Sequence, residues 1–600
     1  SHDTGKYPSH ERWAKGVQVW HRDRLDEAQR ILREEPGVSV LIYDQPCAAE
    51  ERRKRKHGEV PTPARRVLIN EAVCEGCGDC GVKSNCLSVF PVETEMGRKT
   101  QIHQSSCNLD YSCLDGDCPA FVTAILPPGG SRVQPVPAAG KVDFERGLPE
   151  PDFKVPAEAK LYLTGIGGTG VVTVTQILST AALLDGKHVL SLNQTGLSQM
   201  GGPVVSHLKI ADEARPVSSK IGVDDADSYI VFDVLSGSTD QNLARARPGK
   251  TIAVASTSQV PTGGMVNSTK LKFPQWKCIK DRIESATLPE ANVYLDARGL
   301  AEHLFGSHMP ANLITIGAAF QAGAIPIRAA SIERAIELNG IAVEANKQAF
   351  RAGRLAAADP GWVRAQTPPR AGALDDQPAV SAEARELVEE VAADGELVRM
   401  LEVRVPELID FQNRGYGRDY SQFVKRVLGA ERRLGQKETP LTLAVARFLF
   451  KLMAYKDEYE VARLHRKAAF KQMVSSQFGE GARINHMLYP PFLRALGLKK
   501  KIAFGRWFEP GLWLLARLKV LRGTWLDVFG YGQVRRVERQ LIHEYRGLVE
   551  AELADLSADS IDRAIAIARL PDLIRGYEQI KLDNVAHFRE EVRRLRADQP

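Results

Sequence analysis

Seven of the nine cysteines lie between Cys74 and Cys118, and their spacing is suited to holding iron. Cys74, Cys77 and Cys80 form a C-x2-C-x2-C run, whose two-residue gaps let three thiolates reach adjacent irons of one cubane cluster. The fourth ligand of such a triplet typically comes from a distant Cys-Pro pair, and Cys118-Pro119 has that form. Glycines between the cysteines relieve backbone crowding and leave amides free to donate to cluster sulfides.

The remaining clustered cysteines predict a second metal cluster. Its candidate ligands are Cys86, Cys107 and Cys113. Two full [4Fe-4S] clusters need eight thiolates and the block supplies seven, so the eighth ligand is left open. The alternatives are Cys47, an oxygen of Asp115 or Asp117, or a three-iron cluster. Zinc sites usually show two separated C-x2-C pairs, so the pattern favours one or two [4Fe-4S] clusters over zinc.

A second candidate site is the glycine-rich turn GIGGTG at residues 165–170, between an expected strand and an expected helix. Its candidate cofactor-binding residues are Gly165, Gly167, Gly168 and Gly170. A dinucleotide site also needs a carboxylate at the end of the next strand, but that strand ends in Asn193, Gln194 and Thr195. We therefore expect no nicotinamide or flavin dinucleotide. The turn either binds the phosphate of another ligand or is needed only for packing of the strand against the helix. The loop with Ser198 and Gln199 either lies near a ligand or another chain, or only connects two strands.

The elements around these motifs predict a multidomain fold of α/β plus α type. Residues 1–60 contain a helical pattern at 24–34 and an apolar run at 37–43 that is typical of a buried parallel strand, too little for a complete domain. Residues 64–126 form a small, loop-heavy, ferredoxin-like iron–sulfur block that needs bound metal for stability. Residues 127–156 are a linker rich in proline and glycine.

The rest of the chain predicts two further domains. Residues 158–355 alternate apolar strands with helical segments, which indicates a Rossmann-like domain with a mostly parallel sheet and helices on both faces. Its strands are expected at residues 160–164, 188–192, 229–232, 251–255, 293–295 and 313–316. A linker follows at 356–379, and residues 380–600 show only helical patterns, without strand signals. Helices are expected there at residues 382–392, 397–410, 441–466, 511–522, 534–553 and 560–568.

Composition narrows the class of protein. The chain is 44% hydrophobic and 26% charged with a net charge of +6, and it has no run of about 20 apolar residues that would cross a membrane. The basic run at 52–56 is interpreted as a solvated face, because no aromatic platform for nucleic acid accompanies it. An odd, clustered set of cysteines without a signal-peptide pattern indicates metal or redox chemistry in a cytoplasmic protein.

Several segments together resemble one family, the indolepyruvate ferredoxin oxidoreductases within the thiamine-dependent 2-oxoacid:ferredoxin oxidoreductases. The matching segments are IYDQPCAAEERRKRK, the cysteine-rich block, GIGGTGVVTVTQIL with TGLSQMGGPV, and the helical AYKDEYEVARL, DVFGYGQVRRVERQLI and PDLIRGYEQIKLDNV. The resemblance covers nearly the whole chain. It is most specific in the cysteine-rich block and in residues 158–355, which resemble the γ domain of this family.

The resemblance implies a division of labour between this chain and partners. Long family members carry a pyrimidine-binding and a thiamine-diphosphate-binding domain before the ferredoxin block, so residues 1–60 resemble the C-terminal end of that thiamine domain. The family's thiamine motif, G-D-G followed downstream by N-N, occurs nowhere in the sequence, and Gly116-Asp117-Cys118 is the nearest string. The expected partners are therefore thiamine-binding and pyrimidine-binding segments or subunits of the same oligomeric enzyme, and ferredoxin.

The resemblance also implies an activity. It is the oxidative decarboxylation of an aryl-2-oxoacid such as indolepyruvate, with thiamine diphosphate and Mg²⁺ in the complete enzyme, coenzyme A as acyl acceptor, and electrons passing through [4Fe-4S] clusters to ferredoxin. This chain would be the electron-transfer and γ-domain portion of that oxidoreductase, active only with the thiamine-binding part, and no catalytic residue is identified in it. The alternative is a non-catalytic iron–sulfur electron-transfer or scaffold subunit of another oxidoreductase complex.

Overall fold

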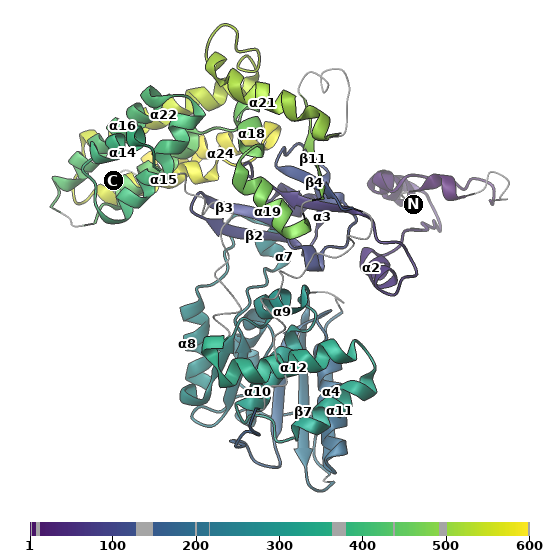
Figure 1. Cartoon of the computed structure of the whole chain (residues 1–600). Helices are drawn as coiled ribbons and strands as arrows, with labels where there is room; N and C mark the ends of the chain where they lie inside the picture. Colours follow the sequence, from purple (N-terminus) through teal and green to yellow (C-terminus); the bar gives the residue numbers. More distant parts are fainter. Residues whose placement is uncertain are drawn as a thin grey trace. The chain divides into compact units, whose positions relative to one another are not determined.

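The computed structural model describes the chain except residues 2, 8–12, 128–143, 145–147, 198–200, 215, 363–379, 436–437, 480, 491–500 and 598–600. Ser198 and Gln199, much of the predicted linker 127–156 and most of the predicted linker 356–379 lie outside the described residues. The chain forms two compact units, Ser1–Pro63 with Asn108–Asp110, and Ala64–Cys107 with Tyr111–Pro600. Figure 1 shows the helices and strands of both units, coloured along the sequence from purple to yellow.

The first unit holds two short helices, α1 (Leu25–Glu34) and α2 (Ala48–Lys56). α1 agrees with the predicted helix, but residues 37–43 form no strand. Val38, Val40 and Ile42 in this run are 96%, 74% and 79% exposed. A strand of the buried type needs a neighbouring strand and an apolar surface to pack against, and the described residues of this unit provide neither. The strand prediction is therefore wrong for this structure.

The cysteine-rich block is built on two small antiparallel sheets. Its elements are β1 (Arg65–Ile69), α3 (Asp79–Ser84), β2 (Val89–Thr94), β3 (Gly97–Ile102) and β4 (Phe121–Ile125). β2 pairs with β3, and the other sheet has the order β1-β4-β11-β12. Its last two strands, β11 (Arg483–Leu488) and β12 (Ile502–Phe504), come from the region in which no strand was predicted. A distant part of the chain therefore completes the sheet of this block.

Residues 160–358 form an α/β domain around a six-stranded sheet. Its strands are β5 (Lys160–Ile166), β6 (His188–Thr195), β7 (Pro203–Ala211), β8 (Ser228–Val231), β9 (Ile252–Ser256) and β10 (Val293–Leu295). The sheet order is β10-β9-β8-β5-β7-β6. β10, β9, β8 and β5 are parallel, whereas β7 is antiparallel to both of its neighbours. Four strands of this sheet are therefore parallel, as predicted, whereas β7 and β6 form an antiparallel pair at one edge.

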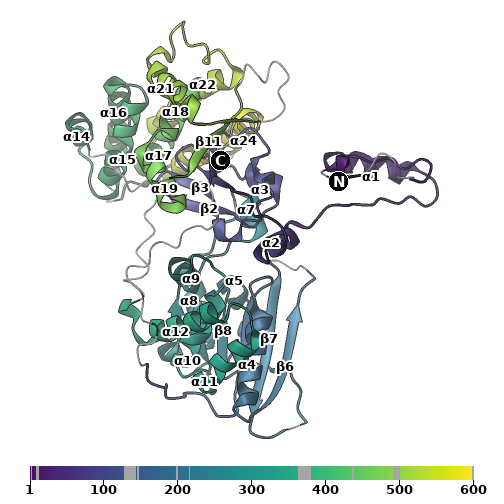
Figure 2. The same cartoon turned by 45° about the vertical axis from the view of Figure 1, so that its right-hand side comes forward.

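Helices cover both faces of this sheet. They are α4 (Val171–Leu184), α5 (Val234–Gly237), α6 (Asp240–Leu243), α8 (Trp276–Ala286), α9 (Ala297–Phe305), α10 (Ala311–Gln321), α11 (Ala329–Asn339) and α12 (Val343–Ala358). α7 (Gly263–Asn267) instead buries Val266 in the core of the cysteine-rich block. On one face, Leu161 and Leu163 pack with α4, α10, α11 and α12 in a single core (Figures 1 and 2). On the other face, Tyr162 and Tyr229 pack with α5 and α8. Successive residues of β5 therefore point to opposite apolar layers.

Residues 313–316, predicted as a strand, lie inside α10. This helix is apolar on all sides, because the nine residues from Asn312 to Phe320 are buried. Apolar periodicity cannot distinguish such a helix from a buried strand. α10 also approaches α12 closely, since a Cβ on Gly317 or on Gly353 would lie 1.9 Å from a backbone oxygen of the other helix.

The C-terminal region is mainly helical. Its helices are α14 (Ala382–Glu389), α15 (Gly395–Phe411), α16 (Arg414–Arg432), α17 (Pro440–Met453), α18 (Glu458–His465), α19 (Ala468–Phe478), α21 (Glu509–Arg517), α22 (Gln533–Ala554), α23 (Ile561–Arg569) and α24 (Glu578–Ala597). The single helix predicted at 441–466 is two helices, because Asp457 caps α18 by accepting a hydrogen bond from the Glu460 amide at 2.8 Å. α16 and α19 were not predicted, and α24 was predicted only in part, by the helical segment PDLIRGYEQIKLDNV.

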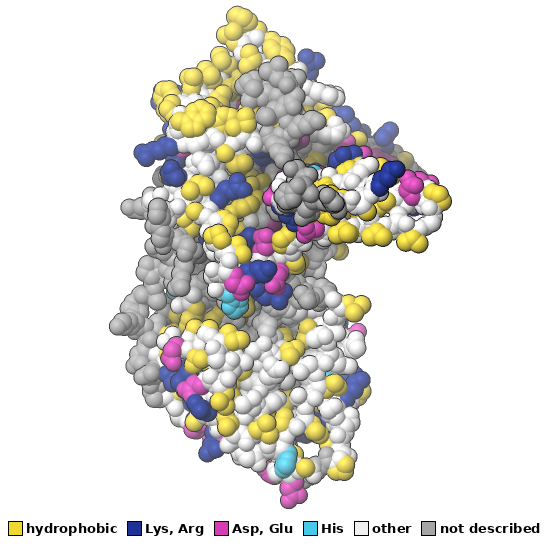
Figure 3. Space-filling model, turned by 90° about the vertical axis from the view of Figure 1, so that its right-hand side faces the viewer, with side chains coloured by type: hydrophobic (Ala, Val, Ile, Leu, Met, Phe, Trp, Pro, Cys, Tyr) yellow, Lys and Arg dark blue, Asp and Glu magenta, His cyan; other side chains and the backbone are white. Residues whose placement is uncertain are grey.

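None of the described helices is long and apolar enough to cross a membrane. On the face shown in Figure 3, lysine and arginine side chains are interspersed with acidic and apolar ones. This mixed surface agrees with the small net charge of +6 for a chain of 600 residues.

Candidate metal centre

The seven clustered cysteines lie in one block, and each is a free thiol. Cys74 and Cys113 are buried, whereas Cys47 and Cys278, outside the block, are exposed. The half-buried members are Cys77, Cys80, Cys86, Cys107 and Cys118. All except Cys77 belong to or pack against one apolar core of the block. Free thiols gathered in apolar surroundings are the donor set that an iron–sulfur cluster requires.

Two glycines shape the loop that carries the C-x2-C-x2-C run. The backbone is left-handed at both, with φ of +61° at Gly76 and +84° at Gly78. A Cβ at Gly76 would lie 2.2 Å from the carbonyl oxygen of Arg98, so no other residue fits there without a shift of the backbone. The Gly76 amide donates to Cys74 Sγ at 3.3 Å. The loop therefore turns tightly and directs an amide at a sulfur atom.

Four cysteines were predicted to share one cluster, and the pKa values of three of them are raised in part by the charges of other members of the group. Burial raises the pKa of Cys77 to about 11, and the neighbouring Cys74 contributes to this rise. Burial, together with the charges of Cys74 and Cys77, raises the pKa of Cys80 to about 12. Burial also raises the pKa of Cys118 well above its ordinary value, with contributions from Cys74 and Cys77. Negative charges on these thiols disfavour one another, so a metal that binds them has to displace their protons.

The other three cysteines, Cys86, Cys107 and Cys113, line the same apolar core. Cys86 Sγ accepts a hydrogen bond from the Ser88 amide at 3.4 Å. Cys47, one alternative for the eighth ligand, is exposed at the N-terminal cap of α2 in the other compact unit. The three cysteines of the block therefore remain the candidate ligands of a second cluster.

The C-terminal region holds the backbone on both sides of Cys74. Tyr577 donates its hydroxyl to the carbonyl oxygen of Val73 at 2.5 Å, across 504 residues of sequence. The Arg575 guanidinium donates to the carbonyl oxygen of Glu75 at 3.1 Å. These contacts restrain the first cysteine loop, and no local pattern in the sequence indicates them.

A histidine of α18 holds the second cysteine loop in the same way. His465 Nε2 lies 3.0 Å from the carbonyl oxygen of Pro119, the residue after Cys118. Burial lowers the pKa of His465 to about 3, so its ring is neutral near pH 7. The Asn70 side-chain amide also donates to the carbonyl oxygen of Leu464 at 3.2 Å. Both loops with predicted iron ligands are thus positioned by residues far away in the sequence.

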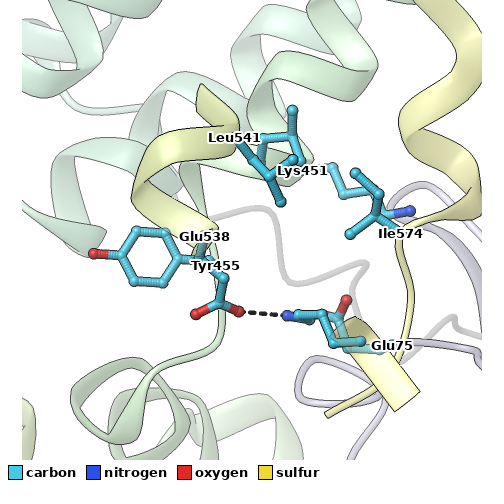
Figure 4. Close-up of a pocket in the computed structure, with 8 residues that line it drawn as sticks. Glu75, Lys451, Tyr455, Glu538, Leu541 and Ile574 are labelled. Atoms are coloured by element: carbon cyan, nitrogen blue, oxygen red, sulfur yellow. Dashed lines mark hydrogen bonds and ion pairs between the residues drawn. The ribbon is translucent and has the colours of Figure 1, made fainter. Parts of the chain in front are cut away.

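A cavity of about 20 Å³, enough for one water molecule, lies under the first cysteine loop. It is lined by Glu75, Lys451, Leu452, Tyr455, Glu538, Leu541, Ile574 and Lys581 (Figure 4). Although burial raises the pKa of Glu75, nearby lysines, Lys581 foremost, lower it to about 2. Lys581 also forms a buried ion pair with Glu538. The cavity is too small for an oxoacid or an organic cofactor, and the loop rests on an interior lined by charged side chains.

The glycine turn joins β5 to α4, as predicted. A Cβ at Gly165 would lie 2.8 Å from Val171 and 3.1 Å from Phe232, so strand–helix packing requires this glycine. Gly168 and Gly170 have left-handed backbones, with φ of +82° and +93°. The space where a Cβ of Gly170 would point is open. Packing therefore explains Gly165, whereas the end of the turn at Gly170 is accessible.

Gly167 makes two backbone hydrogen bonds with the second glycine-containing loop. Its amide donates to the carbonyl oxygen of Gly202 at 2.7 Å, and its carbonyl oxygen accepts from the Gly201 amide at 3.2 Å. These bonds bring together the two loops that the sequence singled out. The Gly167 amide is therefore already engaged within the protein.

The order of the strands also argues against a dinucleotide. In dinucleotide-binding folds the strand after the first helix lies beside the first strand and carries the carboxylate that holds the ribose. Here β6 lies at the sheet edge and β7 separates it from β5. Asn193, at the end of β6, accepts a hydrogen bond from the Ser206 hydroxyl at 2.6 Å. β7 therefore takes the place of the adjacent strand, and the amide side chain of Asn193 stands at the end of β6 where a dinucleotide-binding fold has a carboxylate.

A polar network joins the cysteine-rich block to the α/β domain. His103, after β3, contacts the Glu302 carboxylate of α9 through Nε2, and its Nδ1 lies 2.7 Å from the Ser106 hydroxyl. His103, Glu302 and His308 have potential ligand atoms within 4.8 Å of one another. The Arg298 guanidinium contacts both His103 and Glu302, and its charge would repel a cation. We therefore interpret the network as a junction between domains.

Acid should weaken this junction. Burial raises the pKa of Glu302, but His103 and Arg298 outweigh it and lower the pKa to about 2. A carboxyl with a lowered folded-state pKa stabilises the fold above its ordinary pKa of 4.5, and this stability is lost as the pH falls toward 2. We expect the free energy of unfolding to fall by on the order of 2 kcal/mol over this range through Glu302 alone.

Urea unfolding at about pH 5 and about pH 3 measures this effect. The Glu302→Gln variant should lose less stability between the two pH values than the unsubstituted chain. Glu290→Gln removes an exposed carboxyl of the same domain and should behave like the unsubstituted chain. Equal acid sensitivity of Glu302→Gln and the unsubstituted chain contradicts the prediction.

Two family models match the chain. Residues 160–356 match a model described as pyruvate ferredoxin/flavodoxin oxidoreductase. Residues 397–594 match a model described as a family of unknown function, DUF6537. The first match spans β5 to α12, and the second includes the two strands that complete the cysteine-rich block.

Individual proteins are similar to about a third of this chain. Indolepyruvate oxidoreductase subunit IorB of Archaeoglobus fulgidus is 25% identical over 195 residues, which are 32% of this chain and 92% of that protein. The common γ subunit of the pyruvate and ketoisovalerate oxidoreductases of Thermococcus litoralis is 29% identical over 175 residues, 29% of this chain and 82% of that protein. Among solved structures, pyruvate oxidoreductase subunit PORC from Thermotoga maritima is 20% identical with a TM-score of 0.26, covering 33% of this chain and 95% of that chain.

Proposed function

The chain belongs to the 2-oxoacid:ferredoxin oxidoreductase family, and from this premise we propose that it is the electron-transfer and γ-domain portion of an enzyme that oxidises an aryl-2-oxoacid such as indolepyruvate. The complete enzyme decarboxylates the oxoacid, passes the acyl group to coenzyme A and delivers the electrons singly to ferredoxin. The observation that carries the proposal is that the free cysteines of the block, all except Cys77, belong to or pack against one apolar core in a chain that matches a domain of this family.

We propose Cys74, Cys77, Cys80 and Cys118 as the ligands of one [4Fe-4S] cluster, and Cys86, Cys107 and Cys113 as ligands of a second. A bound cluster of this kind supplies reversible one-electron transfer. The chain's own residues bind and orient it. Its apolar core excludes water, the Gly76 amide points at a ligand sulfur, and the C-terminal region restrains both cysteine loops. Such contacts around a cluster set its reduction potential.

Thiamine diphosphate and Mg²⁺ belong, in this proposal, to a partner segment or subunit. The thiamine motif is absent from this sequence, and both curated relatives are named as subunits. The glycine turn is the proposed contact for a phosphate of coenzyme A or of thiamine diphosphate. It precedes the 14-residue helix α4, whose N-terminus offers amides and the positive end of the helix dipole. The open space at Gly170 permits such an approach.

The proposal is tested by assaying the chain with and without its thiamine-binding partner. Indolepyruvate should reduce ferredoxin or a viologen dye only when both parts, coenzyme A, thiamine diphosphate and Mg²⁺ are present. Oxidation of indolepyruvate by the isolated chain contradicts the proposed division of labour. A complex that holds iron and sulfide but oxidises no 2-oxoacid supports instead an electron-transfer or scaffold subunit of another oxidoreductase.

A further inference from the structure

The region that matches the family of unknown function completes the fold of the cysteine-rich block. β11 pairs with β4, with Arg483 opposite Ile125 and His486 opposite Val122, and β12 extends the sheet. α19 covers the apolar face of β1 and β4. The residues of this shared core are Leu68, Val122, Ala124, Leu126, Phe470, Val474 and Phe478. The two segments therefore bury one another's apolar surface and form one structural module.

Lys501, the residue before β12, brings a buried positive charge into this module. Its Nζ has no hydrogen-bond partner among the described residues. It lies over the ring of Phe121 in β4, 4.7 Å from the ring centroid. Phe121 belongs to the apolar core that six of the seven clustered cysteines line, so the Lys501 ammonium lies against that core. The groups whose charges favour its protonation include Cys118, Asp117, Cys113 and Asp79 of the cysteine-rich block.

A buried ammonium without a partner is strongly destabilising unless an opposite charge lies close by. The contact with Phe121 offsets only part of this cost. When Cys118 binds iron it becomes a thiolate, and a [4Fe-4S] cluster with four thiolates carries a net negative charge. The metal-bound state thus adds negative charge to the core against which Lys501 lies.

We propose that residues 397–594 are a structural part of the iron–sulfur module and that Lys501 faces the Cys118 side of the bound cluster, where its charge favours the reduced state. This inference rests on the proposed function, because it takes the cluster from there. Reduction adds one electron and no proton, so the net negative charge of the cluster increases by one. A cation held nearby in a poorly polarisable interior stabilises the more negative state and raises the reduction potential.

The test compares Lys501→Met, Lys501→Arg and the unsubstituted full chain after anaerobic purification. Iron and sulfide are assayed first, and redox titration monitored by electron paramagnetic resonance then measures the reduction potential. In Lys501→Met the ratio of reduced to oxidised cluster at a fixed potential should fall about tenfold, which corresponds to about 59 mV for a one-electron couple. Lys501→Arg keeps the charge and should restore the potential.

Lys471→Met is the matched control. This lysine of α19 belongs to the same region, but it is paired with Glu509 at 3.2 Å and is half exposed. Its removal should leave the reduction potential unchanged. If Lys501→Met fails to fold, Lys501→Gln, which keeps a polar side chain without the charge, allows the same comparison.

Two results overturn the inference. One is an unchanged potential in Lys501→Met at full iron content. The other is equal loss of iron in the Met and Arg variants, which assigns Lys501 to packing alone. Zinc without sulfide in the unsubstituted chain overturns both this inference and the proposed function. An assembled enzyme that oxidises indolepyruvate, with an unchanged potential in Lys501→Met, overturns this inference and leaves the proposed function standing.

Discussion

Replacing Cys77 with serine should remove the iron of one cluster and abolish dye reduction by the assembled enzyme. Cys77 is the middle cysteine of the C-x2-C-x2-C run. The charge of Cys74 raises its pKa, and its own charge raises the pKa of Cys80. A serine hydroxyl is a harder and less acidic donor than a thiol, and iron–sulfur clusters select soft thiolates. If two clusters are present, the iron and sulfide per chain should fall by about half.

Colorimetric assays of iron and acid-labile sulfide measure this outcome, and electron paramagnetic resonance identifies the remaining cluster. Cys278→Ser is the control, because this cysteine of α8 is exposed and lies outside the block. It should retain full iron and full activity. Full iron in Cys77→Ser, or zinc without sulfide in the unsubstituted chain, contradicts the proposed ligand set.

A chain that ends at residue 379 should hold no iron. Without the C-terminal region, β4 loses its neighbour β11, and the backbone contacts from Tyr577 and His465 to the cysteine loops disappear. The buried side chains Phe470, Val474 and Phe478 are lost as well. Each contributes about 2 kcal/mol through burial of apolar surface, and their sum approaches the total stability of a small domain. The cysteine-rich block should therefore unfold and be cleaved rapidly in limited proteolysis.

Shortening the chain at its other end is the matched control. Residues 1–60 belong to the separate compact unit, so their removal should leave the iron content and the proteolytic stability of the cysteine-rich block unchanged. Mass spectrometry of the fragments locates the cleavage sites in both shortened chains. Full iron in the chain that ends at residue 379 contradicts the view that residues 397–594 are part of the iron–sulfur module.

Local patterns predicted much of the α/β domain correctly. The alternation of apolar and helical segments indicated β5, α4, β8, β9 and β10 close to their observed bounds, because each element carries its own periodicity. The strand expected at residues 313–316 is α10, since a helix buried on all sides has no polar face to reveal its period. The apolar run at 37–43 is extended and exposed, because a strand depends on neighbours that this unit does not contain among its described residues.

Residue types and spacing were sufficient to predict a bound iron–sulfur cluster, which stays a prediction. Thiolate chemistry and the C-x2-C-x2-C spacing pointed to Cys74, Cys77, Cys80 and Cys118 as one group, because three of these four cysteines are neighbours in sequence. Only the tertiary structure showed what holds and surrounds this group. β11, β12, Tyr577, His465 and Lys501 reach it from hundreds of residues away. They act through backbone pairing, single hydrogen bonds and one buried charge, each contributed by an isolated residue or a short strand, so they leave no local pattern in the sequence.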